Sequence, residues 1–115
     1  MALEKRTRVE IFLPVRTDTT DYRAVTDWLS EELAFARGGS TLTTPFTGLY
    51  ASPTAHVEVA RDQIQILFCD LDLNVADPIQ YEKLVAYLGD MRHLLMELLD
   101  EEDVWIIYHQ ITRIL

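Results

Sequence analysis

The sequence predicts an α+β fold in which strands and helices follow one another in the order βαββαβ. Three observations lead to it. Apolar residues alternate in some stretches, recur at three- and four-residue steps in two others, and are separated by glycine, proline and hydroxyl residues. Short connections and right-handed crossovers turn this order into a ferredoxin-like sandwich, a four-stranded antiparallel sheet with two helices on one face. A chain of 115 residues suits one such domain, so residues 1–115 are predicted to form a single domain.

The first strand is predicted over residues 8–15, where apolar side chains appear at the two-residue period of a half-buried strand. The hydroxyl and acidic residues that follow are typical of a helix N-terminus. From Asp21 to Ala36, apolar residues three and four positions apart predict a helix with one core face, which includes Trp28. Gly38 is expected to end this helix, because glycine adopts the left-handed conformation at no steric cost.

Residues 40–46, "STLTTPF", predict an edge strand, since threonine favours strands and Pro45 cannot donate to a ladder. Residues 47–62 contain Gly48 and small residues and predict a loop or irregular insertion, although "HVEV" within it also suits a short strand. Residues 63–75 form the most continuous apolar stretch. Their apolar side chains fall on both faces, which predicts a central strand covered on both sides.

The clearest helix start is "DPIQ", with Asp77 as the cap, Pro78 at the first helical position and Gln80 three residues after the cap. A helical period of apolar residues then continues to residue 99 and includes Tyr81 and Val85 near its start and Leu98 near its end. Residues 104–115 are β-branched and aromatic, which predicts the last strand.

The net charge is −9, from 19 acidic and 10 basic residues. A surface with this imbalance repels the phosphates of nucleic acids and anionic lipids, so neither nucleic acid nor a membrane is an expected partner. The short basic cluster of Lys5, Arg6 and Arg8 is interpreted as a solvated N-terminus. No apolar stretch is long enough for a signal peptide or a membrane span, and the cytoplasm is the expected location.

Cys69 is the single cysteine, so no intramolecular disulfide is possible, and its apolar neighbours predict a core position. The stretch "FARGGSTLTT" resembles a phosphate-binding loop, yet its glycines follow a helix, where the dipole is negative, and no lysine follows them. We therefore interpret the glycines as a helix end and expect no nucleotide or other cofactor.

Asp70 and Asp72 should place two carboxylates on one face of a strand, where they could hold a divalent cation or act as acid and base. Solvated carboxylates at a strand end are the simpler interpretation. His109 alternates with Tyr108 in the last strand. If His109 faces the open side of the sheet, near Glu10 or Asp70, it is a candidate general base; packing is the alternative.

On the second helix, Asp90, His93 and Glu97 share one face, and His93 with Glu97 could supply two metal ligands. No third ligand is evident from the sequence, so an exposed helix face is the favoured interpretation and no metal is expected. The acidic turn at residues 100–103, "DEED", suggests solvated carboxylates or contact with a basic partner.

Both helices are expected on one face of the sheet, which leaves Phe12, Ile66 and Phe68 on the other. A large exposed apolar patch usually marks an interface or a ligand site. The leading hypothesis is a homodimer formed through this open face, and the alternatives are a ligand cleft or cover from residues 47–62.

With this order established, the pattern of "RVEIFLPV", a helix, "GGSTL", "TGLY", "RDQIQILFCDL", a helix and a strand resembles small bacterial ferredoxin-like α+β proteins of unassigned function. The resemblance covers about residues 6–115. It implies a compact sandwich, often oligomeric through its sheet, and supplies no catalytic residues. More distantly, the pattern is similar to dimeric α+β barrels, ACT-like regulatory domains and PII-like signalling proteins.

These observations favour a small non-enzymatic binding or interaction module that self-associates through its open sheet face. The alternative is a small-molecule enzyme of the dimeric α+β barrel type, with a cleft near His109 and the pair Asp70 and Asp72.

Overall fold

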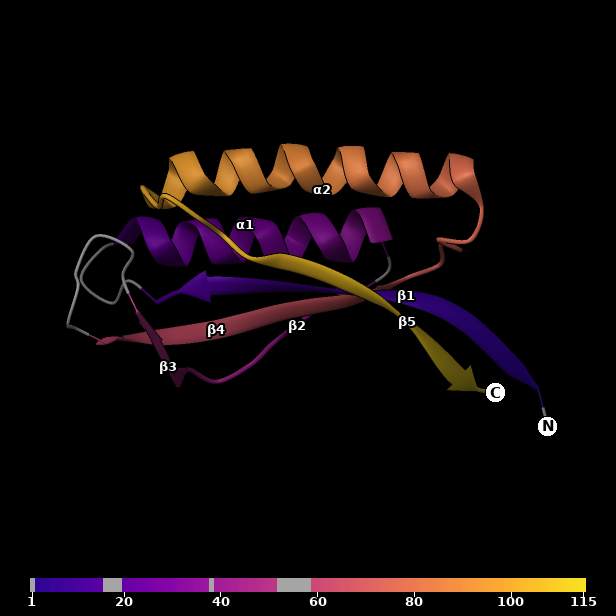
Figure 1. Cartoon of the computed structure of the whole chain (residues 1–115), viewed down its shortest axis with the longest axis horizontal. Coiled ribbons are helices and arrows are strands. Elements are labelled where there is room, and N and C mark those ends of the chain that lie inside the picture. Colours follow the sequence, from indigo (N-terminus) through magenta and orange to yellow (C-terminus); the bar gives the residue numbers. More distant parts are fainter. Residues whose placement is uncertain (1, 16–19, 38, 52–58) are drawn as a thin grey trace.

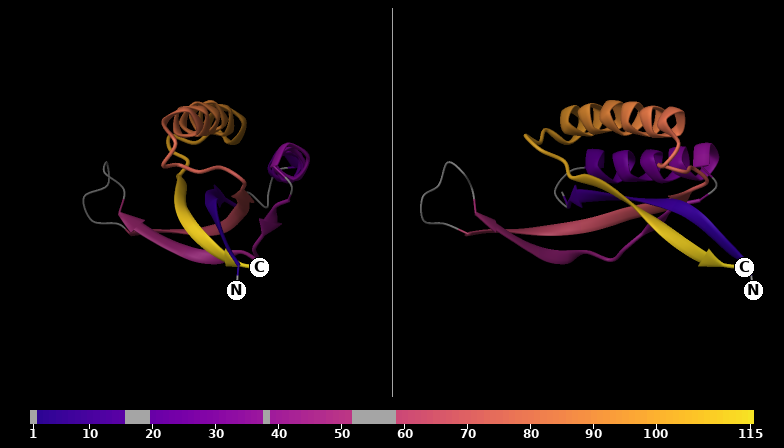
Figure 2. Two further views of the ribbon diagram at one scale, coloured as in Figure 1. Left: turned by 90° about the vertical axis from the view of Figure 1, so that its right-hand side faces the viewer. Right: turned by 45° about the vertical axis from the view of Figure 1, so that its right-hand side comes forward.

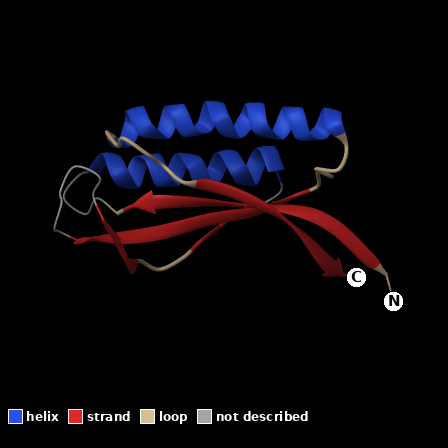
Figure 3. Ribbon diagram, in the orientation of Figure 1, coloured by secondary structure: helices blue, strands red, loops and turns tan. Residues whose placement is uncertain are grey.

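The structure, a computed structural model, describes residues 2–15, 20–37, 39–51 and 59–115. Its strands and helices are, in order, β1 (Leu3–Pro14), α1 (Thr20–Arg37), β2 (Thr41–Leu42), β3 (Phe46–Ala51), β4 (Val59–Leu71), α2 (Pro78–Leu99) and β5 (Ile106–Ile114). Both helices lie on the same side of the sheet (Figures 1 and 3). The predicted fold class is therefore confirmed.

The sheet is antiparallel, with the strand order β2-β4-β1-β5 and with β3 also paired to β4. Both β2 and β3 pair with the edge of β4 that does not contact β1. Together they fill one of the four strand positions that the sequence predicted, so five strand segments make a sheet four strands wide. Pro45 lies in the gap between β2 and β3, where no ladder donor is needed. Thr43 bridges this gap, because its Oγ1 accepts a hydrogen bond of 3.0 Å from the Ile66 N–H.

The core lies between the sheet and the helices. Its members are three odd-numbered residues each of β1 and β4, one stripe from each helix, and Val104 before β5: Val9, Ile11, Leu13, Leu67, Cys69, Leu71, Tyr22, Val25, Leu29, Leu33, Leu84, Leu88, Met91, Leu95, Leu99 and Val104. Cys69 is 3% exposed, which confirms its predicted core position. Buried Thr7 keeps its hydroxyl satisfied by donating to the Leu73 carbonyl over 2.8 Å.

The first strand begins at Leu3 and not, as the alternation suggested, at Arg8. Its added residues pair with β5 in a register that runs from Leu3 opposite Ile114 to Ile11 opposite Ile106. Lys5 and Arg6, interpreted with Arg8 as a solvated N-terminus, belong to the same strand as Arg8, and of the three only Lys5 is exposed. Charged residues hid this strand, because alternation in hydrophobicity is lost where both faces reach solvent.

The prediction of a loop over residues 47–62 is wrong for 47–51 and 59–62, which belong to the paired strands β3 and β4. The pairing runs from Phe46 opposite Ile64 to Ala51 opposite Val59. These strands form a hairpin that reaches beyond the helices (Figure 2). Residues 52–58, which include most of "HVEV", lie outside the described residues.

Helix α2 begins as predicted. The Asp77 side chain accepts a hydrogen bond of 2.9 Å from the Ile79 N–H, and Pro78 occupies the first helical position. The core face is narrower than predicted on both helices, because Trp28 is 40% exposed and Tyr81, Val85 and Leu98 are exposed as well. A helix that lies on a sheet buries one stripe of side chains. Apolar side chains beside that stripe lie at the border between helix and solvent and remain partly exposed.

Among the described residues, no helix is both long enough and apolar enough to cross a membrane.

Two leucines of α2 allow the packing to be tested. Leu95 is fully buried, whereas Leu98 on the same helix is 46% exposed. We expect Leu95→Ala to lower the free energy of unfolding by about 3 kcal/mol, and Leu98→Ala by less than about 1 kcal/mol. Urea unfolding followed by circular dichroism measures both changes, and equal losses would contradict the assigned core.

Asp100 is the C-terminal cap of helix α2, and it adopts the left-handed conformation with φ 50°. A carboxylate at this end also opposes the helix dipole. We expect Asp100→Gly to raise the free energy of unfolding by about 0.5–1 kcal/mol, because glycine removes both the strain and the charge. Asp100→Asn, which removes mainly the charge, should give a smaller gain, and a loss of stability in Asp100→Gly would refute this account of the helix end.

Candidate functional site

The face of the sheet opposite the helices carries the residues of β1 and β4 that do not point into the core. Register places Phe12 opposite Ile66, and Glu10 opposite Phe68. Trp105 adds to this group, since its ring meets that of Phe12 edge to face at 6.4 Å between centroids. The three residues expected on the open face therefore lie there together, and their role as an interface stays a prediction.

Asp70 forms an ion pair across the open face with Arg8, its register partner on β1. Arg8 Nε and Nη2 donate to the two carboxylate oxygens of Asp70 over 2.7 and 3.0 Å. The guanidinium carbon of Arg8 also lies 5.1 Å from the centre of the Phe68 ring. The hydrogen bonds from Arg8 hold the pKa of the Asp70 carboxyl below its usual value, with a smaller contribution from His109. Asp70 is thus kept as a carboxylate.

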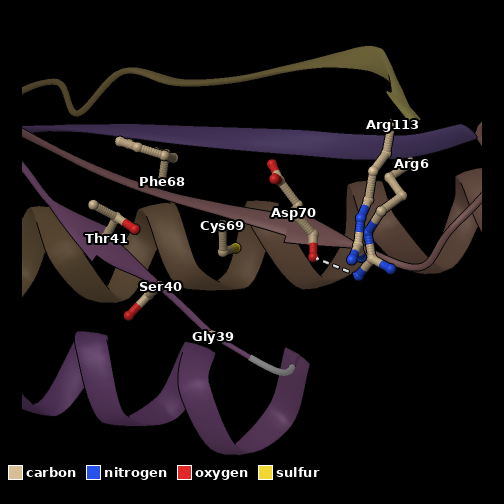
Figure 4. Close-up of a pocket in the computed structure, with 8 residues that line it drawn as sticks. All are labelled: Arg6, Gly39, Ser40, Thr41, Phe68, Cys69, Asp70 and Arg113. Carbon is tan, nitrogen blue, oxygen red and sulfur yellow. Dashed lines mark hydrogen bonds between the residues drawn. The ribbon is translucent and has the colours of Figure 1, made fainter. Parts of the chain in front are cut away.

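A cleft of about 390 Å³ adjoins this ion pair at the end of the sheet where β1 begins and β5 ends. Its lining residues come from the connection between α1 and β2 and from strands β1, β2, β4 and β5 (Figure 4): Arg6, Gly39, Ser40, Thr41, Phe68, Cys69, Asp70 and Arg113. The curl of the sheet allows strands from opposite edges to contribute to one cleft (Figure 2).

Arg6 is fixed within the cleft. Its Nη1 donates to Glu4 Oε1 over 2.8 Å, and its Nη2 donates to the Asp70 carbonyl over 3.0 Å. Arg113 is exposed and makes no hydrogen bond or ion pair with any described residue. Figure 4 shows both side chains extending into the same region beside Asp70.

The segment that follows α1 forms another part of the lining. Gly39 has φ 146°, a conformation that other residues rarely adopt, and Ser40 donates its hydroxyl hydrogen to the Ser30 carbonyl over 3.0 Å. This bond ties the segment to the helix. Thr41 is exposed, and it lies opposite Phe68 in the register. The described residues of this segment therefore line the cleft without adding charge, and the Ser40 hydroxyl hydrogen is engaged by α1.

Of the other candidates from the sequence, His109 meets the condition set for it, since it faces the open side and lies close enough to Asp70 to help lower the pKa of that carboxyl. His109 lies on the open face opposite Arg8, is exposed and does not line the cleft, and Asp72 lies just beyond the end of β4. His93 and Glu97 are exposed on α2. In the part of the chain that the structure describes, no three His, Cys, Asp or Glu side chains gather as metal ligands would.

Sequence reasoning missed Arg6 and Arg113. The signal that could have found them is the alternation of faces along each strand. Arg6 lies opposite Ile111 and Arg113 lies opposite Glu4, and both arginines belong to the face away from the helices. The sequence alone does not give that register, because the first part of β1 lacks the apolar alternation that reveals a strand.

No protein-family model matches the sequence, and no match is found among curated proteins. Among solved structures, the fold is similar to that of CPII, a nitrogen regulatory PII-like protein from Thiomonas intermedia K12, in a structure bound to ADP, AMP and bicarbonate. The TM-score is 0.54 at 10% sequence identity, and the match covers 98% of this chain and 99% of that one. At this identity the likeness establishes a shared ferredoxin-like fold. It agrees with the distant similarity to PII-like proteins inferred from the sequence pattern.

The ion pair predicts a pH dependence of stability. Because the folded-state pKa of Asp70 lies below the ordinary value of 3.8, its contribution is present above that pH and is lost as the pH falls through the folded-state value. At neutral pH, Asp70→Asn should lower the free energy of unfolding by up to about 1 kcal/mol, a figure reduced for the partial exposure of the pair. The loss should vanish in strong acid.

Urea unfolding at a series of pH values measures this difference. The control is Asp72→Asn, which changes an exposed carboxyl two residues further along the chain. A loss for Asp70→Asn that stays constant down to strong acid would show that the ion pair is not its cause.

Proposed function

We propose that the protein is a non-enzymatic regulatory module that binds a small molecule and self-associates, as a dimer, through the open face of its sheet. The observation that carries the proposal is the apolar group on that face, which neither helix covers. Phe12, Ile66 and Phe68 lie in adjacent register positions, and Trp105 and Ile107 extend the group toward β5. The similar PII-like protein is a nitrogen regulator solved with small molecules bound, which supports the regulatory part of the proposal.

A second copy of this chain is the occupant that best suits the open face. Trp105 and Ile107 are 65% and 39% exposed, and large exposed apolar patches are uncommon on monomers. Aromatic residues and arginine are common at the centres of interfaces, and Phe12, Phe68 and Arg8 provide both. The ion pair of Arg8 with Asp70 is already formed within one copy, so burial in a dimer would leave neither charge uncompensated.

The geometry favours binding over catalysis. Both carboxylate oxygens of Asp70 are occupied by Arg8, and the lowered pKa of Asp70 suits a permanent anion better than a proton donor. His109 stands outside the cleft, and Arg8 occupies Asp70, one of the two carboxylates suggested as acid and base, which makes each candidate poorly suited to catalysis there. We therefore rank the enzyme of the dimeric α+β barrel type below the binding module.

Size-exclusion chromatography with light scattering tests self-association. The wild-type protein should be a dimer at micromolar concentration, whereas Ile66→Asp and Ile107→Asp should shift it toward the monomer, because each places a charge within the apolar group. Ile107→Asp is the gentler variant, since Ile107 is already 39% exposed. Circular dichroism checks that both variants are folded.

Leu94→Asp is the matched control, because it adds the same charge at an exposed apolar position of α2, in the helical layer. It should leave the dimer intact. Added salt should strengthen the dimer by screening the repulsion between two copies that each carry a net charge of −9. A wild-type monomer, or equal dissociation by Leu94→Asp, would refute association through the open face.

A further inference from the structure

We propose that the cleft beside Asp70 binds a small dianionic metabolite, a phosphate monoester or a dicarboxylate, held by the guanidinium groups of Arg6 and Arg113. This inference rests on the proposed function, since it names the class of small molecule that the module would bind. It depends on the position of the two arginines, the donors they retain, the local balance of charge, and the size and lining of the cleft.

The two arginines come from neighbouring antiparallel strands. Arg6 lies opposite Ile111, and Arg113 lies two residues further along β5, so the arginines are diagonal neighbours on one face. Diagonal neighbours in a sheet have Cα atoms roughly 7–8 Å apart, a separation that long side chains readily span. Both arginines line the same cleft (Figure 4). An oxyanion between them could therefore contact both groups.

Arg6 is oriented in advance. Its hydrogen bonds to Glu4 and to the Asp70 carbonyl use two of the five N–H donors of the guanidinium and leave three. A guanidinium already held in place loses little conformational entropy when it binds an oxyanion. Arg113 retains all its donors toward the described residues, and its planar group suits both phosphate and carboxylate.

The charge of the cleft is opposite to that of the whole chain. Of the residues that line it, Arg6 and Arg113 carry positive charges and Asp70 carries the negative one. Asp70 and Glu4, the register partner of Arg113, already accept hydrogen bonds from Arg8 and Arg6, whereas Arg113 forms no ion pair with any described residue. A local excess of positive charge on a chain with a net charge of −9 is the setting that an anion requires.

The lining indicates that the ligand is larger than a bare ion. A volume of about 390 Å³ falls within the roughly 300–1,000 Å³ usual for small-molecule sites. On the side of the cleft away from the arginines, Thr41 offers a hydroxyl group that could contact the polar body of such a molecule, whereas the Ser40 hydroxyl hydrogen is already donated to Ser30. The glycine-containing segment thus contributes to the site, although the positive charge comes from the strands.

Isothermal titration calorimetry with the full chain tests this inference. The probes are ribose 5-phosphate, inorganic phosphate, succinate and uncharged ribose. We expect ribose 5-phosphate or succinate to bind and ribose not to bind, and the tighter of the two anions identifies which oxyanion the cleft favours. Arg113→Gln should weaken binding at least about tenfold, because it removes one of two charge-assisted contacts.

Arg23→Gln is the matched control, since Arg23 is exposed on α1, away from the cleft. It should bind the anion as the wild type does. Equal affinity of Arg113→Gln and the wild type, equal loss in Arg23→Gln, or no binding of either ligand anion below about 10 mM would overturn the inference.

The proposed self-association is judged separately by light scattering of the same samples. A dimer that binds none of the anions would refute the ligand class alone. A monomer that binds an anion through Arg113 would refute the open-face dimer and keep the cleft.

Discussion

The pairing of β1 on both of its edges is the constraint on which the rest of the structure depends. One register joins β1 to β4 and the other joins it to β5. Because direct partners in a sheet share a face, these two registers decide which side chains of three strands face the helices and which face away. A slip by one residue would exchange Ile11 for Phe12 in the core and would separate Arg8 from Asp70.

The fold follows from the sequence where one face of an element is buried. The alternation in the middle of β1, the cap at Asp77 and the period of α2 are direct consequences of contact with the core, and each was recognisable. Prediction failed at the start of β1, where charged residues interrupt the apolar alternation, and along β3, where Gly48 and small residues suggested a loop. Trp28 and Leu98 show the opposite error, in which apolar periodicity extends beyond the surface that the sheet can cover.

The site was less predictable than the fold for a related reason. Asp70 stood out because acidic residues at the end of an apolar strand are conspicuous, yet its partner Arg8 is 62 residues away in the sequence. Arg6 and Arg113 are further apart still, and only the pairing of the first and last strands brings them together. The glycine and hydroxyl segment after α1 illustrates the same limit. Its position after the helix was predicted from the sequence. Its position in the cleft was not, because the rest of the lining comes from strands that lie far before and far after it in the sequence.

The pairing of the two ends of the chain also bears on how the protein folds. Leu3 lies opposite Ile114, and the Leu115 N–H donates to the Ala2 carbonyl over 3.0 Å. Strand β5 is synthesised after every other described element, so one edge of β1 remains open on the ribosome until β5 has been made. Contacts this distant in sequence require the closure of a long loop, which slows folding. The helices and the β3–β4 hairpin can form earlier, and the cleft, which contains Arg113, is completed last.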